Sequence, residues 1–212
     1  MATGAVNVPS SEKSAESRRR IMAAAREEVE AKGILGLRVQ DVARNAGVSV
    51  PLIYKYFGDR DGLLADVLSG MFVDCSKRRL AAASGVIGDG SRSVTPVQLV
   101  QALMLPPDEQ VRKDRALTLQ MLAAAAEIPA LATRLAATQR EVHSQLNAFI
   151  ADTFNKLGLD DSVPVAALSM LIQASALGFV FNDMLGTEGV SHNEFARLLR
   201  VLVGAVVEKH TA

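Results

Sequence analysis

Residues 42–57, VARNAGVSVPLIYKYF, contain two stretches with helical apolar spacing, and only three residues separate them. Gly47 supplies the backbone freedom that a tight turn needs. Ser49 is placed to cap the second stretch, and Pro51 falls in its first turn, where a missing N–H costs no hydrogen bond. This stretch therefore predicts two short helices joined by a turn, the layout of a helix-turn-helix.

The rest of the chain also has the spacing of helices, and no stretch favours a strand. Nearly half of the 212 residues are apolar (49%) but few are aromatic (4%), a composition typical of helices packed through small side chains. A capping box, Ser191 with Glu194, marks the start of the last helix. The expected helices are 17–33, 38–46, 50–57, 59 or 60 to about 83, 97–104, 109–126, 130–157, 163–185 and 192–208. We predict an all-α fold.

The chain divides by composition into three parts. Residues 1–16 are small and polar and are expected to be a disordered N-terminal arm. Residues 17–62 contain the predicted helix-turn-helix, and residues 63–212 contain the remaining predicted helices. The Gly/Ser-rich stretch 84–96 is interpreted as a linker within the latter.

The sequence offers little chemistry for catalysis or metal binding. His143, His192 and His210 are scattered, and Cys75 is the only cysteine, so neither a disulfide within the chain nor a thiolate cluster is possible. No nucleophile elbow, phosphate-binding loop or paired-carboxylate motif is present. We therefore expect no enzyme, cofactor or metal. A buried, inert thiol is the favoured interpretation of Cys75, and a redox-sensing thiol is the alternative.

Residues 162–182 carry no charge and approach the length of a membrane span. Their flanks are acidic, and Ser169, Gln173 and Ser175 interrupt the apolar run. A helix buried on all sides is therefore favoured over a transmembrane helix. Because the N-terminus lacks the pattern of a secretory signal, we expect a cytoplasmic protein.

The second helix of the turn motif carries side chains suited to DNA. Such a helix enters the major groove by its N-terminal end, where Val50 and Leu52 can touch thymine methyl groups. Tyr54 and Tyr56 can donate hydrogen bonds to phosphates, and Lys55 can reach a base or a phosphate. By spacing alone, however, the same motif also fits ordinary helix packing with half-buried tyrosines.

Residues 18–68 resemble the DNA-binding domain of TetR-family transcriptional regulators, most clearly in the run AGVS-x-x-x-IY-x-YF-x-x-R-x-x-LL. Carried over by position, the resemblance implies base contacts at Gln40, Val50, Leu52 and Lys55. It implies phosphate contacts at Arg38, Ser49, Pro51, Tyr54, Tyr56 and Arg60. The chain departs from the family in having Arg38 for a capping Ser or Thr, Pro51 for Gly, and Arg60 for Lys.

The resemblance further implies a homodimer, and both the uncharged helix and the last helix have an apolar face that could meet a twofold mate. It also implies that residues 17–62 are a helix-turn-helix DNA-binding domain and residues 63–212 a helical ligand-binding and dimerisation domain, since family members commonly bind a small molecule among the middle helices. The candidate ligand contacts, all of which fit an ordinary core equally well, are Phe72, Leu103, Leu119, Leu122, Phe149, Met170, Gln173 and Phe179. The expected function is a repressor released from a palindromic operator by a small apolar ligand. A ligand-independent helical regulator and a redox-sensing regulator acting through Cys75 are the alternatives.

Overall fold

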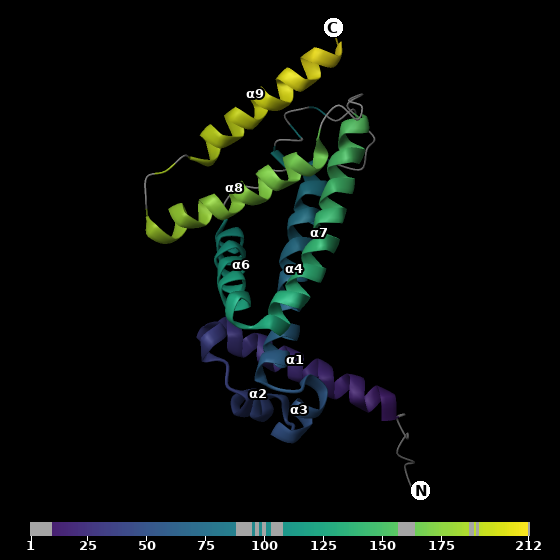
Figure 1. Ribbon diagram of the computed structural model, residues 1–212, viewed down its shortest axis with the longest axis vertical. Coiled ribbons are helices and arrows are strands. Elements are labelled where there is room, and N and C mark those ends of the chain that lie inside the picture. The colour runs from purple at the N-terminus through teal and green to yellow at the C-terminus, as the bar shows by residue number, and fades with distance from the viewer. Residues whose placement is uncertain are drawn as a thin grey trace, which may run out of the picture. The chain divides into compact units, whose positions relative to one another are not determined.

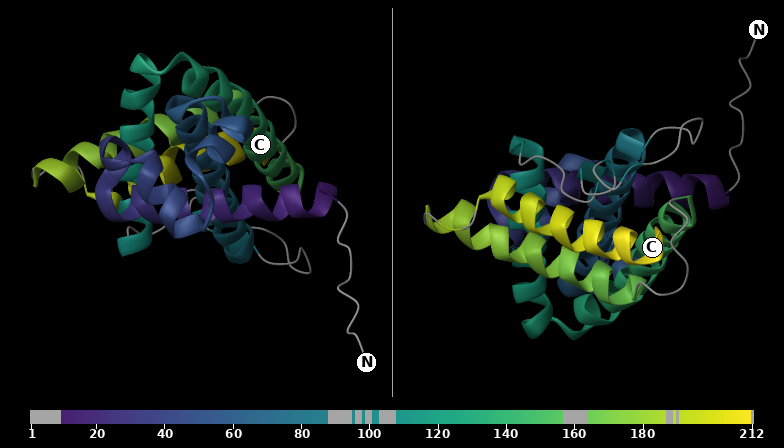
Figure 2. Two further views of the ribbon diagram at one scale, coloured as in Figure 1. Left: turned by 90° about the horizontal axis from the view of Figure 1, so that it is seen from below. Right: turned by 90° about the horizontal axis from the view of Figure 1, so that it is seen from above.

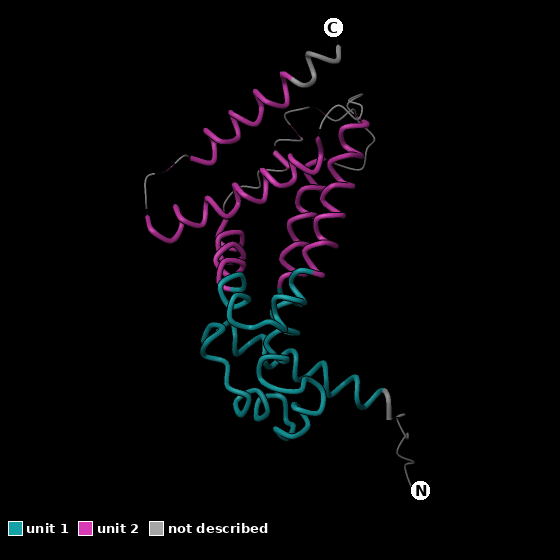
Figure 3. Tube along the Cα trace, viewed as in Figure 1, with its two compact units in different colours: residues 1–71, 121–136 teal, residues 72–120, 137–212 magenta. Residues whose placement is uncertain are grey.

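The computed structural model describes residues 10–87, 95, 98, 101–102, 108–156, 164–186, 189 and 191–211, without the side chains of 10–11 and 206–211. Every regular element in these ranges is an α-helix, so the predicted all-α fold is confirmed (Figure 1). The helices form two compact units, residues 1–71 with 121–136 and residues 72–120 with 137–212 (Figure 3).

The first unit is built on helix α1 (Ser10–Gly36), followed by the short helices α2 (Val39–Ala46) and α3 (Val50–Phe57). It also contains the start of α4 (Arg60–Ile87), the end of α6 (Glu109–Glu127) and the start of α7 (Pro129–Lys156). Residues 63–71 and 121–136 thus join this unit, although the predicted domain boundary at residue 62 assigns them to the second domain. Its largest fully buried side chains are Ile21, Leu37, Ile53, Leu63, Leu64, Leu68, Met121 and Leu131.

The turn between α2 and α3 follows the sequence prediction. Gly47 ends α2 in the left-handed conformation (φ 64°), which a residue with a Cβ rarely adopts. Its N–H donates to the carbonyl of Arg44 at 3.2 Å. Ser49 occupies the N-cap position of α3, but its side chain makes no capping hydrogen bond. The expected side-chain cap is therefore wrong.

Helix α1 begins at Ser10 rather than Ser17, so residues 10–16 are helical and the prediction of disorder is wrong there. Two side-chain contacts, which the apolar pattern of the sequence does not indicate, stabilise this extension. The Ser17 hydroxyl donates to the carbonyl of Lys13 at 2.9 Å, and Arg19 pairs with Glu16. Residues 1–9 lie outside the described residues. The helix also continues past Gly33, which makes a kink with φ 73°, and ends at Gly36.

The second unit combines the later part of α4, the early part of α6 and the later part of α7 with α8 (Val165–Leu185) and α9 (His192–Thr211). Helices α8 and α9 lie side by side (Figures 1 and 2). The core that joins α7, α8 and α9 consists of Ile150, Phe154, Ile172, Leu199 and Val203. A smaller cluster, Ala83, Ile87 and Ala102, packs against Phe149 of α7.

Two further boundaries differ from the prediction, and one is confirmed. Helix α4 runs to Ile87, into the predicted linker 84–96, because Ala83 and Ile87 pack into the core of the second unit. Most of the predicted helix 97–104 lies outside the described residues. The capping box at α9 is confirmed: the Ser191 N–H donates to Glu194 at 2.8 Å, and the Glu194 N–H donates to the Ser191 hydroxyl at 3.1 Å.

Helix α8 is not buried on all sides, so that prediction is wrong. Among the described residues it is the one helix that is long and apolar enough to cross a membrane, but only 22% of its most apolar window is buried. Ile172, Phe179 and Val180 face the core of the second unit, whereas other large apolar side chains of the same helix are exposed. These exposed apolar side chains raise the question of what covers them.

Candidate nucleic-acid interface

Helix α3 is fixed by two buried side chains, Ile53 and Phe57, which lie four residues apart and therefore on one face. The other faces of α3 remain available: Tyr54 is 42% exposed, and Pro51 and Lys55 are exposed as well. Val50 and Leu52 are half-buried at the N-terminal end. The structure therefore places the predicted contacts of α3 on an accessible surface.

Arg38 and Gln40, at the start of α2, are exposed as well. Arg38 occupies the N-cap position without a side-chain capping bond, as its departure from the family pattern leads one to expect. Its backbone carbonyl accepts the N–H groups of Asp41 and Val42 at 3.0 and 3.1 Å. Among the described residues, the side chains of Arg38, Gln40, Tyr54 and Lys55 have no hydrogen bond or ion pair, so their polar groups are free for a partner.

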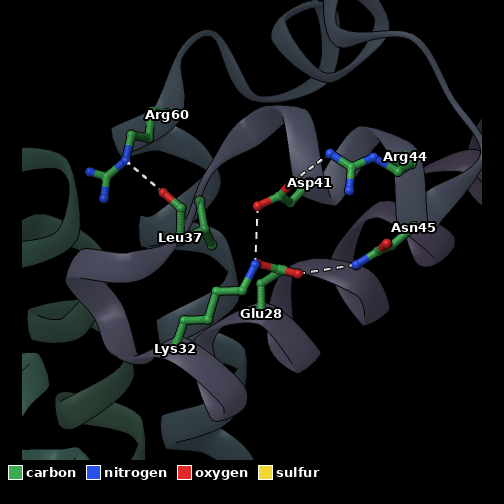
Figure 4. A network of polar contacts seen from close by, with 7 residues as sticks. All are labelled: Glu28, Lys32, Leu37, Asp41, Arg44, Asn45 and Arg60. Atoms are coloured by element: carbon green, nitrogen blue, oxygen red, sulfur yellow. Dashed lines mark hydrogen bonds and ion pairs between the residues drawn. The ribbon is translucent and has the colours of Figure 1, made fainter.

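Helix α2 is held against α1 by a polar network (Figure 4). Lys32 of α1 contacts both Glu28 at 2.7 Å and Asp41 of α2 at 3.0 Å. Arg44 contacts Asp41 at 2.7 Å, and the Asn45 amide donates to Glu28 at 3.1 Å. These contacts fix the position of α2, against which α3 packs.

The same network shifts two pKa values. The hydrogen bond from Lys32 lowers the pKa of Asp41 below its ordinary value. Hydrogen bonds to Glu28 and then Asp41 raise the pKa of Lys32. Both shifts favour the charged forms, so the network is intact near neutral pH.

Arg60 lies close to the end of α1 instead of standing free. Its Nε donates to the carbonyl oxygen of Leu37 at 3.2 Å (Figure 4). Its Nη2 donates to the carbonyl oxygen of Ile34 at 3.4 Å. Carbonyls at the end of a helix lack partners within the helix, and an arginine can satisfy two of them at once. The phosphate contact implied for Arg60 stays a prediction, and the structure adds a second role, in holding α1.

Tyr56 is also engaged within the unit. Its hydroxyl donates to the Ser14 hydroxyl at 3.0 Å, and its ring meets Phe57 edge-on with the ring centres 6.3 Å apart. This bond could not be predicted from the sequence, because Ser14 was expected to lie in a disordered arm. A phosphate contact by Tyr56 would have to share or replace the bond to Ser14.

The second unit contains most of the predicted ligand contacts. Phe72, Leu119 and Phe149 are half-buried, and Phe179 is buried against Phe195 and the His192 ring. Gln173, singled out as an amide that needs a partner, contacts His143 at 2.9 Å and Gln139. Met170 is 65% exposed, Leu122 is exposed and belongs to the first unit, and Leu103 lies outside the described residues.

A charged group that the sequence analysis missed lies beside Phe179. Arg115 of α6 is only 12% exposed, with its guanidinium 5.3 Å from the Phe179 ring centre, 3.1 Å from the His192 Nε2 and 3.6 Å from Asp183. Burial lowers the pKa of Arg115, and burial followed by the charge of Arg115 lowers that of His192. The members come from three helices, so no sequence spacing could have revealed the cluster.

Cys75 is buried on α4, in contact with Arg78 at 3.3 Å. Burial first, and then the charge of Asp114, raises the pKa of the thiol to about 12. The reactive thiolate is therefore nearly absent at neutral pH. Within the part of the chain that the structure describes, no three His, Cys, Asp or Glu side chains are grouped to hold a metal ion.

Comparison with known proteins finds a family match for the part of the chain that contains α2 and α3. Residues 21–67 match the profile of the family described as bacterial regulatory proteins, tetR family. No curated protein matches the sequence. A solved structure from Rhodococcus sp., assigned to the TetR-family transcriptional regulators, is 25% identical, with a TM-score of 0.64 over 91% of this chain and 99% of its own.

Two other solved structures share the fold and hold small molecules. The multidrug binding protein EbrR, complexed with proflavin, is 23% identical, with a TM-score of 0.59 over 90% of this chain and 99% of its own. A transcriptional regulator from Saccharomonospora viridis, in complex with choline, is 20% identical, with a TM-score of 0.59 over 92% and 96%. Residues 21–67 therefore match the DNA-binding domain of the tetR family, and the helix-turn-helix and helical second unit together have the fold of solved TetR-family transcriptional regulators.

Proposed function

We propose that this regulator is a homodimeric repressor that reads a palindromic operator with α3 and leaves it when a small apolar effector binds. One observation carries the DNA-binding part of the proposal. Arg38 and Gln40 at the start of α2 and Tyr54 and Lys55 on α3 are exposed, and no other described residue uses their polar groups. An arrangement that leaves four such groups free suits a nucleic acid better than it suits helix packing.

The proposed contacts divide into two kinds. Gln40, Val50, Leu52 and Lys55 contact base edges in the major groove, where an amide can pair with adenine and an apolar group with a thymine methyl. The second kind of contact is to phosphates, and it sets the register of the helix on the duplex. It consists of Arg38, Ser49, Pro51, Tyr54, Tyr56 and Arg60.

Helices α8 and α9 supply the proposed dimer surface. On α8 the exposed large apolar side chains are Met170, Leu171, Leu177, Phe181, Met184 and Leu185, and on α9 they are Leu198, Val201 and Leu202. Exposed apolar side chains gathered on neighbouring helices mark an interaction site, and a twofold mate would cover them with the same surface. The helix-turn-helix units of the two protomers (the two heads) could then read half-sites about 34 Å apart.

The proposed effector binds in the second unit. Phe72, Leu119, Phe149, Gln173 and Phe179 remain its proposed contacts, whereas the exposed Met170 is better placed to meet a partner protomer. The complexes of EbrR with proflavin and of the Saccharomonospora viridis protein with choline support a small-molecule effector for this fold. Effector binding would favour a spacing of the two heads that misfits the operator, so saturating operator must weaken effector binding by the same factor.

The structure disfavours the redox alternative. A thiol with a pKa of about 12 carries too little thiolate at neutral pH to react readily with peroxide or a disulfide. Regulation through Cys75 would require an opening of α4 that exposes the thiol. We place the protein in the cytoplasm, where double-stranded DNA is within reach.

Selection of bound DNA from a random pool, at near-physiological salt and with purified full-length protein, tests this function. We expect enrichment of a two-armed symmetric site. Enrichment of a site without symmetry would contradict the dimer. No enrichment by a protein shown to be folded and dimeric would contradict DNA reading by the effector-free form.

A further inference from the structure

Asp66 on α4 is a carboxylate buried within the first unit, with 7% of its side chain exposed. Two arginines reach it from different helices. Arg18 of α1 pairs with Oδ2, and Arg134 of α7 pairs with Oδ1. A buried carboxylate is stable as an ion only when such partners hold it, so the three residues depend on one another.

Arg18 extends this group to the recognition helix. Its guanidinium carbon lies 5.2 Å from the ring centre of Phe57, the last residue of α3. Phe57 and Ile53 are the two buried side chains of α3. The side chain of Arg18 is thus shared between the carboxylate on α4 and one of the two anchors that set the position of α3.

Arg134 has a distinct role in this group. Apart from its ion pair with Arg134, the Oδ1 atom of Asp66 has no hydrogen bond among the described residues. Without Arg134 the carboxylate would carry a buried oxygen with no partner, and it would turn to share Arg18 between both oxygens. Arg18 would then shift from its place over Phe57.

We propose that Arg134 is a positioning residue for the recognition helix and acts on it through Asp66 and Arg18. Helix α7 continues from the first unit into the second, where the effector is proposed to bind. A change in the first turns of α7 therefore reaches α3 by this route. The link to operator binding rests on the proposed function, but the effect on α3 does not.

Hydrogen exchange of full-length protein without DNA tests the effect on α3. In Arg134→Gln we expect the amides of residues 54–57 to exchange at least about threefold faster, with a smaller rise in the other helices. Arg134→Lys should restore most of the wild-type protection. Arg140→Gln is the matched control, because Arg140 is exposed on the same helix and has no ion pair among the described residues.

The background variant Asp66→Asn separates positioning from general destabilisation. With the carboxylate gone, Arg134→Gln should add no further exchange in α3. Wild-type protection of α3 in Arg134→Gln would overturn the proposal. So would an equal effect of Arg140→Gln, or a rise spread equally over all helices together with lower global stability.

Operator binding gives the second measurement. On the selected DNA, Arg134→Gln should weaken binding about fivefold while leaving the slope of log Kd against log salt unchanged, since a direct phosphate contact would change that slope by about one. A changed slope would assign Arg134 to the DNA and overturn the positioning role. If the wild type binds no DNA, the proposed function fails, and the exchange experiment still decides the inference.

Discussion

Lys55 and Tyr54 are the residues on which the proposed DNA contact depends most simply, because both are exposed and have no partner among the described residues. We predict that Lys55→Ala weakens operator binding about tenfold or more and Tyr54→Phe weakens it by less, since the phenol supplies one neutral hydrogen bond. A salt titration of both variants checks this. Lys113→Ala, which removes an exposed lysine of the second unit, should match the wild type. Unchanged binding by both variants would refute the contact map.

Arg60 distinguishes a structural role from a DNA contact at one residue. Because its guanidinium holds the carbonyls of Leu37 and Ile34, Arg60→Ala should lower the free energy of unfolding by about 1 kcal/mol, a modest figure since the side chain is partly exposed. Urea unfolding monitored by circular dichroism measures this. A variant that loses operator binding at full stability would assign Arg60 to phosphate alone.

His192 makes the stability of the second unit depend on pH. Its Nε2 faces the guanidinium of Arg115, so protonation would set two donors against each other. Burial and Arg115 lower the pKa of His192 from 6.5, so below pH 6.5 the unfolded chain binds more protons than the folded one. Stability is therefore full above pH 6.5 and falls as the pH drops from there toward the lowered pKa.

We predict that the melting temperature falls more between about pH 7 and pH 5.5 in the wild type than in His192→Gln, which cannot take up the proton. Differential scanning fluorimetry across this range measures the difference. Parallel curves for the two proteins would show that His192 does not control the response.

At the scale of elements, the sequence predicted α2, the turn and α3 well, because their signals are local. Gly47 can adopt the positive φ of the turn, and Pro51 fits the first turn of a helix, independently of the rest of the chain. The start of α1 was missed for the opposite reason. The residues before Ser17 carry no apolar pattern, and one contact that accompanies their helical structure, Ser14 with Tyr56, comes from a residue 42 positions away.

Helix α8 shows a second limit of pattern analysis at this scale. Its uncharged sequence predicted burial on all sides, but a single sequence does not distinguish apolar side chains in the core from apolar side chains on the surface. The structure separates the two sets: Ile172 and Phe179 are buried, whereas Phe181 and Met184 are exposed.

The exposed set on α8 and α9 leads to a prediction about assembly. Leu202→Glu on α9 should convert the proposed dimer to a monomer, because it places a charge in the apolar surface that the mate would cover. Sedimentation velocity measures the mass. Leu35→Glu is the control, since Leu35 is 93% exposed in the first unit and should leave the mass unchanged. A dimeric Leu202→Glu variant, or a monomeric wild type, would place the interface elsewhere or remove it.

At the scale of the whole molecule, the fold class could be predicted because it needs only the period of the apolar residues. The exposed polar residues of α2 and α3 could be predicted because one local motif contains them. The polar contacts that join distant segments could not be predicted from the sequence. Arg18 meets Asp66 from 48 positions away, and Gln173 meets Gln139 from 34 positions away. Such pairs depend on how helices pack, and a single sequence carries no signal for that.

The central claim is that two α3 helices of a dimer read one operator. Its most direct test is a binding titration of the wild type against the selected two-armed site and against the same DNA with one arm scrambled. We predict two protomers bound to the complete site and at least about a hundredfold weaker binding to the single arm, since each head contributes separately to affinity. Equal affinity for both DNAs, or one protomer bound to the complete site, would contradict the account.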